Sequence, residues 1–289
     1  MKKALALGLT TVLWPVLAAG ADILRPYGPV SPVEVFRKLN GLLLDAWPDE
    51  GRAFMEFITS FNVYYLYLAL GLLGVFLLHY FVFGPRKIVH RGEKVPYYGF
   101  FTRFVHWGAA VSMTLLVLSG LAVLFAKALG GGSLVMGLRS VHVGAAFIFA
   151  IFAVFLFLAL VKDMFPAPYD LKWFLVLGGY LSRRTRPVPA GKFNAGQKLW
   201  FWVGTAGGLV MFYTGYKLYQ FTAPVSYLRE VLKIHLYLGL AVLGLFLIHL
   251  YMSVIAVKGA LQSMLTGYKD IEEVAVMHPK FYEKLRLKG

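Results

Sequence analysis

Two histidines lie in one long apolar stretch, residues 232–252, and imidazole is a side chain that binds metals and metal-containing cofactors. The stretch is uncharged after Lys233 and is long enough to cross a bilayer as a helix. His235 and His249 are 14 residues apart, which is about 21 Å along a helix and within roughly 40° of one helix face. One helix therefore offers two imidazoles at two membrane depths, which suggests two stacked cofactors.

An ionisable side chain inside a membrane costs free energy, so each such histidine is a candidate for function. The alternative interpretation is that each imidazole only forms a hydrogen bond with a neighbouring helix. The paired spacing on one face favours a shared function over two separate structural roles.

The composition describes a membrane protein with several spans. Of 289 residues, 59% are hydrophobic and 15% are charged. The net charge is +15, but the lysines and arginines cluster between apolar stretches, so the positive-inside rule accounts for them and nucleic acid is not an expected partner. The chain has no cysteine, which excludes disulfides, cysteine-ligated iron-sulfur clusters and covalently attached c-type haem.

The order of apolar and basic segments predicts the topology. Residues 1–21 have the parts of a secretory signal, with cleavage expected before Asp22 and an uncleaved anchor as the alternative. Basic loops alternate with apolar spans, which places the C-terminus in the cytoplasm. The expected segments after the signal are a periplasmic segment at 22–60, spans at 61–83, 104–126, 140–161, 199–221 and 227–257, a cytoplasmic loop at 162–198 and a cytoplasmic tail at 258–289.

These directions assign a depth to each histidine in the last four spans. His106 and His249 fall near the cytoplasmic face, whereas His142 and His235 fall near the periplasmic face. Two bis-imidazole sites at two depths suit two b-type haems that transfer electrons. A zinc site would need more ligands at one depth, and a proton relay would need acidic residues within the spans. His79 has no partner at its depth, so a structural or interfacial role is expected.

Several motifs together resemble the cytochrome b (gamma) subunit of membrane-bound respiratory formate dehydrogenases. The resemblance covers the last four spans, in order and with compatible spacing. The residues that carry it are RFVHW at 103–107, the stretch 139–144 around His142, GKFNAGQKLWFW at 191–202, IH at 234–235, IHLYM at 248–252, VKG at 257–259 and HPKFY at 278–282.

This resemblance implies a fold and a set of sites. The expected fold is an all-α integral membrane protein, with a four-helix diheme cytochrome b bundle at 96–257 and an additional N-terminal transmembrane helix. The family implies haem pairs at His142/His235 and His106/His249, in agreement with the depth argument. It also implies a cytoplasmic quinone site, for menaquinone or ubiquinone, that carries onto Asn194, Gly196 and Gln197.

The resemblance further implies a complex in the bacterial inner membrane. A molybdenum or tungsten catalytic subunit would oxidise formate, and an iron-sulfur subunit would pass the electrons to this chain, which does not oxidise formate by itself. Residues 22–83 have no counterpart in the shorter family members, and a contact with partner subunits is expected for them. Two alternatives stay open: a cytochrome b anchor of a nickel-iron hydrogenase or thiosulfate reductase, and a haem-free membrane anchor or transporter.

Overall fold

The structure is a computed structural model that describes residues 31–86, 88, 92–183 and 187–287. The expected signal segment, the beginning of the periplasmic segment and His90 lie outside the described residues. Within the described part, four helices are long and apolar enough to cross a membrane. They are Trp47–Val82, Phe100–Leu124, Gly132–Asp163 and Val225–Ala256.

The helices that carry the histidines match the expected spans closely. Helix α4 covers Phe100–Leu124, α5 covers Gly132–Leu160 and ends in the 3-10 turn η2 (Val161–Asp163), and α9 covers Val225–Leu250. Beyond α9 the chain continues as a π-helical segment, η5 (Tyr251–Ala256). These are the elements that place His106, His142, His235 and His249.

The expected span at 199–221 is helical but is not one of the four apolar helices. It consists of α7 (Ala195–Phe201), the π-helical segment η4 (Trp202–Gly207) and α8 (Gly208–Gln220). Its glycines, tyrosines and two lysines lower its mean hydropathy below that of its neighbours. A membrane crossing by this helix stays a prediction.

The described chain divides into two structural units, and the long helices α3, α4, α5 and α9 contribute residues to both. Unit 1 contains described residues 31–63, Ala110–Ala150 and Val210–Tyr237, and unit 2 contains Tyr64–Ala109, Ile151–Leu209 and the residues from Leu238 onward. Each unit has its own packing, so each is described by itself.

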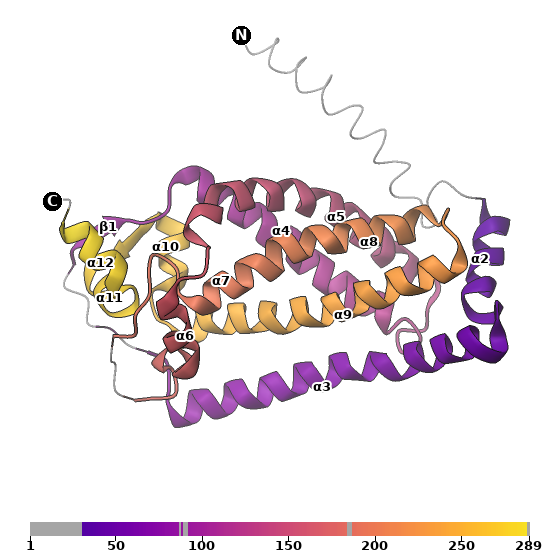
Figure 1. The fold of residues 1–289 in the computed structure, drawn as a ribbon, viewed down its shortest axis with the longest axis horizontal. Helices are drawn as coiled ribbons and strands as arrows, with labels where there is room; N and C mark the ends of the chain where they lie inside the picture. Colours follow the sequence, from indigo (N-terminus) through magenta and orange to yellow (C-terminus); the bar gives the residue numbers. More distant parts are fainter. Residues whose placement is uncertain (1–30, 87, 89–91, 184–186, 288–289) are drawn as a thin grey trace, which may run out of the picture. The chain divides into compact units, whose positions relative to one another are not determined.

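In unit 1, residues 31–63 form two helical segments joined by a short π-helical segment, and this region is called the N-terminal cap below. Helix α2 (Pro32–Leu44) starts at Ser31, whose side chain accepts a hydrogen bond from the Glu34 backbone N–H at 3.2 Å. The π-helical segment η1 (Trp47–Gly51) then leads into α3 (Arg52–Val82), which begins earlier than the expected span at 61–83. Figure 1 shows α2 beside the beginning of α3 and the connection between α8 and α9.

A buried arginine in α9, Arg229, forms hydrogen bonds with the N-terminal cap. The guanidinium of Arg229 is 3% exposed and donates to Glu50 at 3.0 Å. It also donates to carbonyl groups near the C-terminus of α2, namely those of Gly41, Leu42 and Asp45. The last carbonyls of a helix lack intrahelical partners, and this arginine donates to them in addition to the Asp45 N–H that bonds the Gly41 carbonyl. A small apolar core packs beside it, formed by Leu42, Phe54, Phe221 and Leu228.

In unit 2 the loop and tail that were expected to be polar are folded. The loop contains α6 (Pro168–Leu175) and the short turn η3 (Leu177–Gly179). Strand β1 (Lys94–Pro96) pairs antiparallel with β2 (Tyr268–Asp270), with Val95 opposite Lys269. Around this pair lie α10 (Ala260–Thr266), α11 (Ile271–Met277) and α12 (Pro279–Arg286), as Figure 1 shows.

The tail has a buried polar core, for which the sequence analysis offered no signal. Lys269 and Glu273 form an ion pair at 2.7 Å, with side chains 6% and 1% exposed. His278 is buried and its Nδ1 lies 3.0 Å from the Gly191 carbonyl oxygen. Burial, reinforced by Lys269, lowers the pKa of the His278 imidazole well below its usual range. The backbone N–H of Lys280 also donates to the Ala190 carbonyl, so this part of the tail packs against residues 190 and 191.

Candidate functional site

Unit 1 brings the imidazole rings of His142, in α5, and His235, in α9, close together. Their ring centroids are 6.4 Å apart, and the ring planes are inclined by 71°. These are two of the four predicted ligands, and the structure pairs them as the depth argument expects. The arrangement leaves room between the rings for one atom bound by both imidazoles.

A hydroxyl from the preceding helix fixes the outer nitrogen of each ring. Ser119 Oγ of α4 lies 3.1 Å from His142 Nδ1, and Thr214 Oγ1 of α8 lies 2.9 Å from His235 Nδ1. The hydroxyl of Ser119 donates to the Leu115 carbonyl one turn earlier, so it accepts from the imidazole. The Leu116 carbonyl, 3.1 Å from His142 Nδ1, also only accepts. These contacts place the proton of His142 on Nδ1 and leave Nε2 as a free ligand atom.

A glycine follows each of these hydroxyl residues and lies against the same imidazole. A Cβ added at Gly120 would be 3.1 Å from His142 Cε1, and one added at Gly215 would be 3.2 Å from His235 Cε1. The rings therefore pack closely on the neighbouring helix backbone, and a side chain at either glycine would require the imidazole to move by a few tenths of an ångström. Helices α4 and α8 thus present the same Ser/Thr-Gly pair to the histidine of the following long helix.

These hydroxyl and glycine residues were missed by the sequence analysis. The signal that could have found them is a repeat: a Ser/Thr-Gly pair stands 23 residues before His142 and 21 residues before His235. Single serines and threonines are common in membrane helices, so the pair becomes informative only when it is aligned with the histidines.

Unit 2 contains the second facing pair, His106 of α4 and His249 of α9. Their ring centroids are 6.3 Å apart, and the planes are inclined by 59°. The ring of Trp200, from α7, stacks on His249 with centroids 5.5 Å apart and an angle of 23°. The Nδ1 atom of His106 is buried and has no hydrogen-bond partner among the described residues. This pair has the same spacing as the first one but a different surrounding shell.

Two π-helical segments lie next to this second pair. Segment η4 begins two residues after Trp200, and η5 begins two residues after His249. π-Helical segments are rare in proteins, and those that occur often lie at functional sites. Here they change the direction of side chains immediately after the two residues whose rings stack on each other.

The spacing of both pairs fits two axial ligands of one iron. A metal-bound imidazole nitrogen lies about 2 Å from the metal and the ring centre about 1.1 Å beyond it, so two opposed rings have centres roughly 6.2 Å apart. Among the residues the structure describes, no three His, Cys, Asp or Glu side chains converge. Each site therefore offers two imidazoles, which suits a haem whose macrocycle supplies the remaining ligands.

The predicted quinone residues gather in the first turn of α7, where they have a structural role. Asn194 is the N-cap: its Oδ1 accepts from Gln197 N, and Gln197 Oε1 accepts from Asn194 N, both at 2.9 Å. Gly196 lies against Trp173 of α6, since an added Cβ would meet that ring at 2.8 Å. The NAGQ sequence therefore forms a capping box, and the amide nitrogens of both side chains stay free of these two bonds.

A buried ion pair lies in the same turn and was not expected. Lys198 Nζ is 2.7 Å from Asp170 Oδ2, with side chains 7% and 9% exposed. The other carboxylate oxygen of Asp170 is buried without a hydrogen-bond partner in the described part of the chain. Asp170 lies in the loop between spans, so a search for acidic residues within the spans did not find it.

The remaining histidine of the expected spans, His79, is held by hydrogen bonds. Its Nδ1 lies 2.6 Å from the hydroxyl of Tyr251, and its Nε2 lies 3.2 Å from the Tyr180 carbonyl oxygen. Both ring nitrogens are therefore engaged by protein groups. This agrees with the structural role expected for His79.

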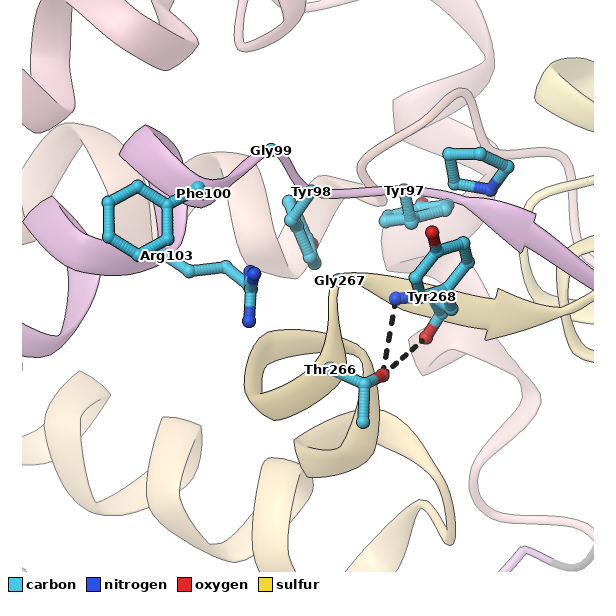
Figure 2. Close-up of a pocket in the computed structure, with 9 residues that line it drawn as sticks. Tyr97, Tyr98, Gly99, Phe100, Arg103, Thr266, Gly267 and Tyr268 are labelled. Carbon is cyan, nitrogen blue, oxygen red and sulfur yellow. Dashed lines mark hydrogen bonds between the residues drawn. The ribbon is translucent and has the colours of Figure 1, made fainter.

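A pocket of about 340 Å³ lies at the start of α4, outside both histidine pairs. Figure 2 shows Tyr98, Phe100 and Arg103 on one side and Thr266 and Tyr268 on the other. Its lining does not include the predicted quinone residues of α7. One of its lining residues, Tyr98, lies beside Phe193, which precedes the capping-box turn, with ring centroids 6.1 Å apart.

These features define an all-α membrane protein in which histidines from different helices lie in two close pairs. The chain belongs to the family of prokaryotic cytochromes b561, whose model matches residues 97–267. Membership implies binding of b-type haem, and the matched region includes all four paired histidines.

Curated relatives are similar over the same region. The nitrate-inducible formate dehydrogenase cytochrome b556 subunit of Escherichia coli (strain K12) is 28% identical over 195 residues, which is 64% of this chain and 89% of that protein. The formate dehydrogenase cytochrome b556 subunit of Haemophilus influenzae is 24% identical over 197 residues, which is 63% of this chain and 79% of that protein.

Proposed function

We propose that this chain holds two b-type haems, one between His142 and His235 and one between His106 and His249, and passes electrons between them. The observation that carries the proposal is the presence of two facing imidazole pairs, with ring centroids 6.4 and 6.3 Å apart. The two imidazoles of each pair would hold one haem, and a haem bound in this way would supply electron transfer. The chain's own residues orient the imidazoles and exclude water from them.

We further propose that the chain is the membrane anchor of a formate dehydrogenase. Both curated relatives described above are named as cytochrome b556 subunits of that enzyme. The partners are an iron-sulfur subunit and a molybdenum or tungsten catalytic subunit, and formate oxidation takes place on the catalytic subunit. Electrons enter at the His142/His235 pair and leave from the His106/His249 pair.

The proposed electron acceptor is a membrane quinone, menaquinone or ubiquinone, at the first turn of α7. Asn194 and Gln197 use their side-chain oxygens in the capping box, so each amide NH₂ is available to donate to a quinone carbonyl. Gly196 has no side chain, so the ring of Trp173 packs directly against the backbone of this turn. The turn lies in the same unit as His106 and His249 and leads directly to Trp200.

The haem proposal is tested by haem stoichiometry and a reduced-minus-oxidised spectrum of the purified full chain. We expect two b-type haems per chain, and loss of one in His235→Ala. His79→Ala is the matched control, because it removes a histidine of the same membrane domain that hydrogen bonds already occupy. A chain without a b-type spectrum, or a His79→Ala variant that loses a haem, would contradict the assignment.

The partner proposal is tested by purifying the chain from its native membrane and identifying the proteins that accompany it. We expect an iron-sulfur subunit and a molybdenum or tungsten subunit with formate dehydrogenase activity. Recovery of a nickel-iron hydrogenase or a thiosulfate reductase instead would retain the haem proposal and reject this complex.

A further inference from the structure

The two histidine pairs have different hydrogen-bond environments. In the first pair, Nδ1 of each imidazole meets a hydroxyl, from Ser119 and from Thr214, at 3.1 and 2.9 Å. Backbone groups add to this, since the rings of His142 and His235 also form hydrogen bonds with Leu116 and Met211. Each of these backbone groups lies three residues before its hydroxyl, so the two arrangements are equivalent.

The second pair has no equivalent of this shell. The Nδ1 atom of His106 is buried without a hydrogen-bond partner among the described residues, and the ring of His249 stacks on Trp200. Its neighbour is the flat face of Trp200, which offers no acceptor in the ring plane. The contrast is therefore between a pair with a hydroxyl at the Nδ1 atom of each ring and a pair in which the Nδ1 atom of His106 has no partner among the described residues.

This contrast matters because the outer nitrogen controls how strongly an imidazole donates electrons to a metal. An acceptor on Nδ1–H pulls the proton away from the ring and raises the basicity of Nε2. A more basic axial ligand stabilises the oxidised iron, which lowers the reduction potential. Hydrogen bonding around axial ligands is one of the means by which a protein sets that potential.

We infer that Ser119 and Thr214 are positioning residues that hold His142 and His235 with the proton on Nδ1, and that they make this site the lower-potential one of the two. The inference rests on the proposed two-haem function. It gives the proposed direction an energetic cause, since electrons move from the lower-potential His142/His235 site to the higher-potential His106/His249 site. That order delivers electrons to the unit that contains the α7 turn.

The test is an optical redox titration of the haem-loaded chain and of its hydroxyl variants. We expect two titration components, with the lower one missing in His235→Ala. In Thr214→Val and Ser119→Ala the lower component should shift upward and the higher one should stay. A tenfold change in the oxidised-to-reduced ratio at fixed potential corresponds to about 59 mV for one electron, which such a titration resolves.

Two kinds of control separate hydrogen bonding from packing. Thr214→Ser and Ser119→Thr keep the hydroxyl, so the lower component should keep its wild-type midpoint in both. These variants still test the inference if Ser119→Ala loses its haem. Thr114→Val removes a hydroxyl from α4 that bonds only the Ala110 carbonyl, so it should leave both components unchanged.

Several results would overturn the inference. These are an unshifted lower component in Thr214→Val and Ser119→Ala at full haem content, a shift in the higher component, a shift in the hydroxyl-retaining variants, or the same shift in Thr114→Val. A wild-type chain without a b-type spectrum would overturn the proposed function itself, and the haem content reports this before any titration.

Discussion

The rings of His142 and His235 face each other with centroids 6.4 Å apart, and the Nδ1 atom of each ring meets a hydroxyl of a neighbouring helix. The Nδ1 atom of each imidazole is thus engaged, and Nε2 is the nitrogen that remains for a ligand role. His79 differs from these two histidines, because protein groups engage both of its ring nitrogens and none remains for a metal. The predictions below follow from this geometry and from that of unit 2.

The pairing of the ligands is testable by double substitution. His142→Ala and His235→Ala should each remove the same haem, so the double variant should lose no more haem than either single one. Combining His142→Ala with His249→Ala should remove both haems. Haem-to-protein ratios measure this directly, and a double variant His142→Ala/His235→Ala without any haem would refute the pairing.

The glycines behind the imidazoles should be intolerant of side chains. Gly215→Val places atoms where even a Cβ is 3.2 Å from the His235 ring, so we expect loss of the haem held by that ring. Gly120→Val should act in the same way on His142. The matched control is Gly74→Ala in α3, which meets no atom within 4 Å and should stabilise the helix by up to about 1 kcal/mol. Equal haem content in Gly215→Val and Gly74→Ala would contradict the close packing.

Asn194 allows capping and quinone binding to be separated. Asn194→Ala removes the N-cap acceptor and should cost about 1 kcal/mol of stability. Asn194→Asp keeps an acceptor for Gln197 N but lacks the amide donors, so it should stay stable while quinone reduction slows. Thermal unfolding and quinone reductase rates, measured with both haems retained, distinguish the two effects. Unchanged rates in Asn194→Asp would remove this residue from the quinone site.

The buried pair of Lys198 and Asp170 should be strongly coupled. Removing one partner leaves an unpaired buried charge, which costs roughly 3–5 kcal/mol. Lys198→Met and Asp170→Leu should each lower the unfolding midpoint markedly, whereas the double variant should be less destabilised than the sum. Additive effects in this cycle would show that the two side chains do not depend on each other.

The packing of the tail should weaken in acid. Burial and Lys269 hold the pKa of His278 well below its ordinary value of about 6.5, so the unfolded tail binds more protons than the folded tail between these two values. Stability from this group is complete above about pH 6.5 and is lost as the pH falls toward the folded pKa. Hydrogen exchange of α11 and α12 at decreasing pH measures this. In His278→Phe the pH dependence should disappear, and an equally strong dependence in that variant would assign it to another group.

Much of the membrane architecture follows from the sequence alone. The apolar stretches predicted helices where α3, α4, α5 and α9 lie, because twenty apolar residues in lipid leave the backbone no other way to satisfy its hydrogen bonds. The basic loops between these helices predicted the direction of each span and therefore the membrane depth of each histidine. Depth then paired His106 with His249 and His142 with His235, since two ligands of one metal must lie at the same level.

Only the tertiary structure decided what surrounds those imidazoles. Hydroxyls at Ser119 and Thr214 gain their role from a histidine more than twenty residues away, and such contacts depend on the rotation and approach of two helices, which hydropathy does not encode. The same holds for Lys198 and Asp170, which come from segments that appeared only polar. The local sequence determined which segments are helices and which histidines share a level. Helix packing decided which nitrogen of His142 carries its proton.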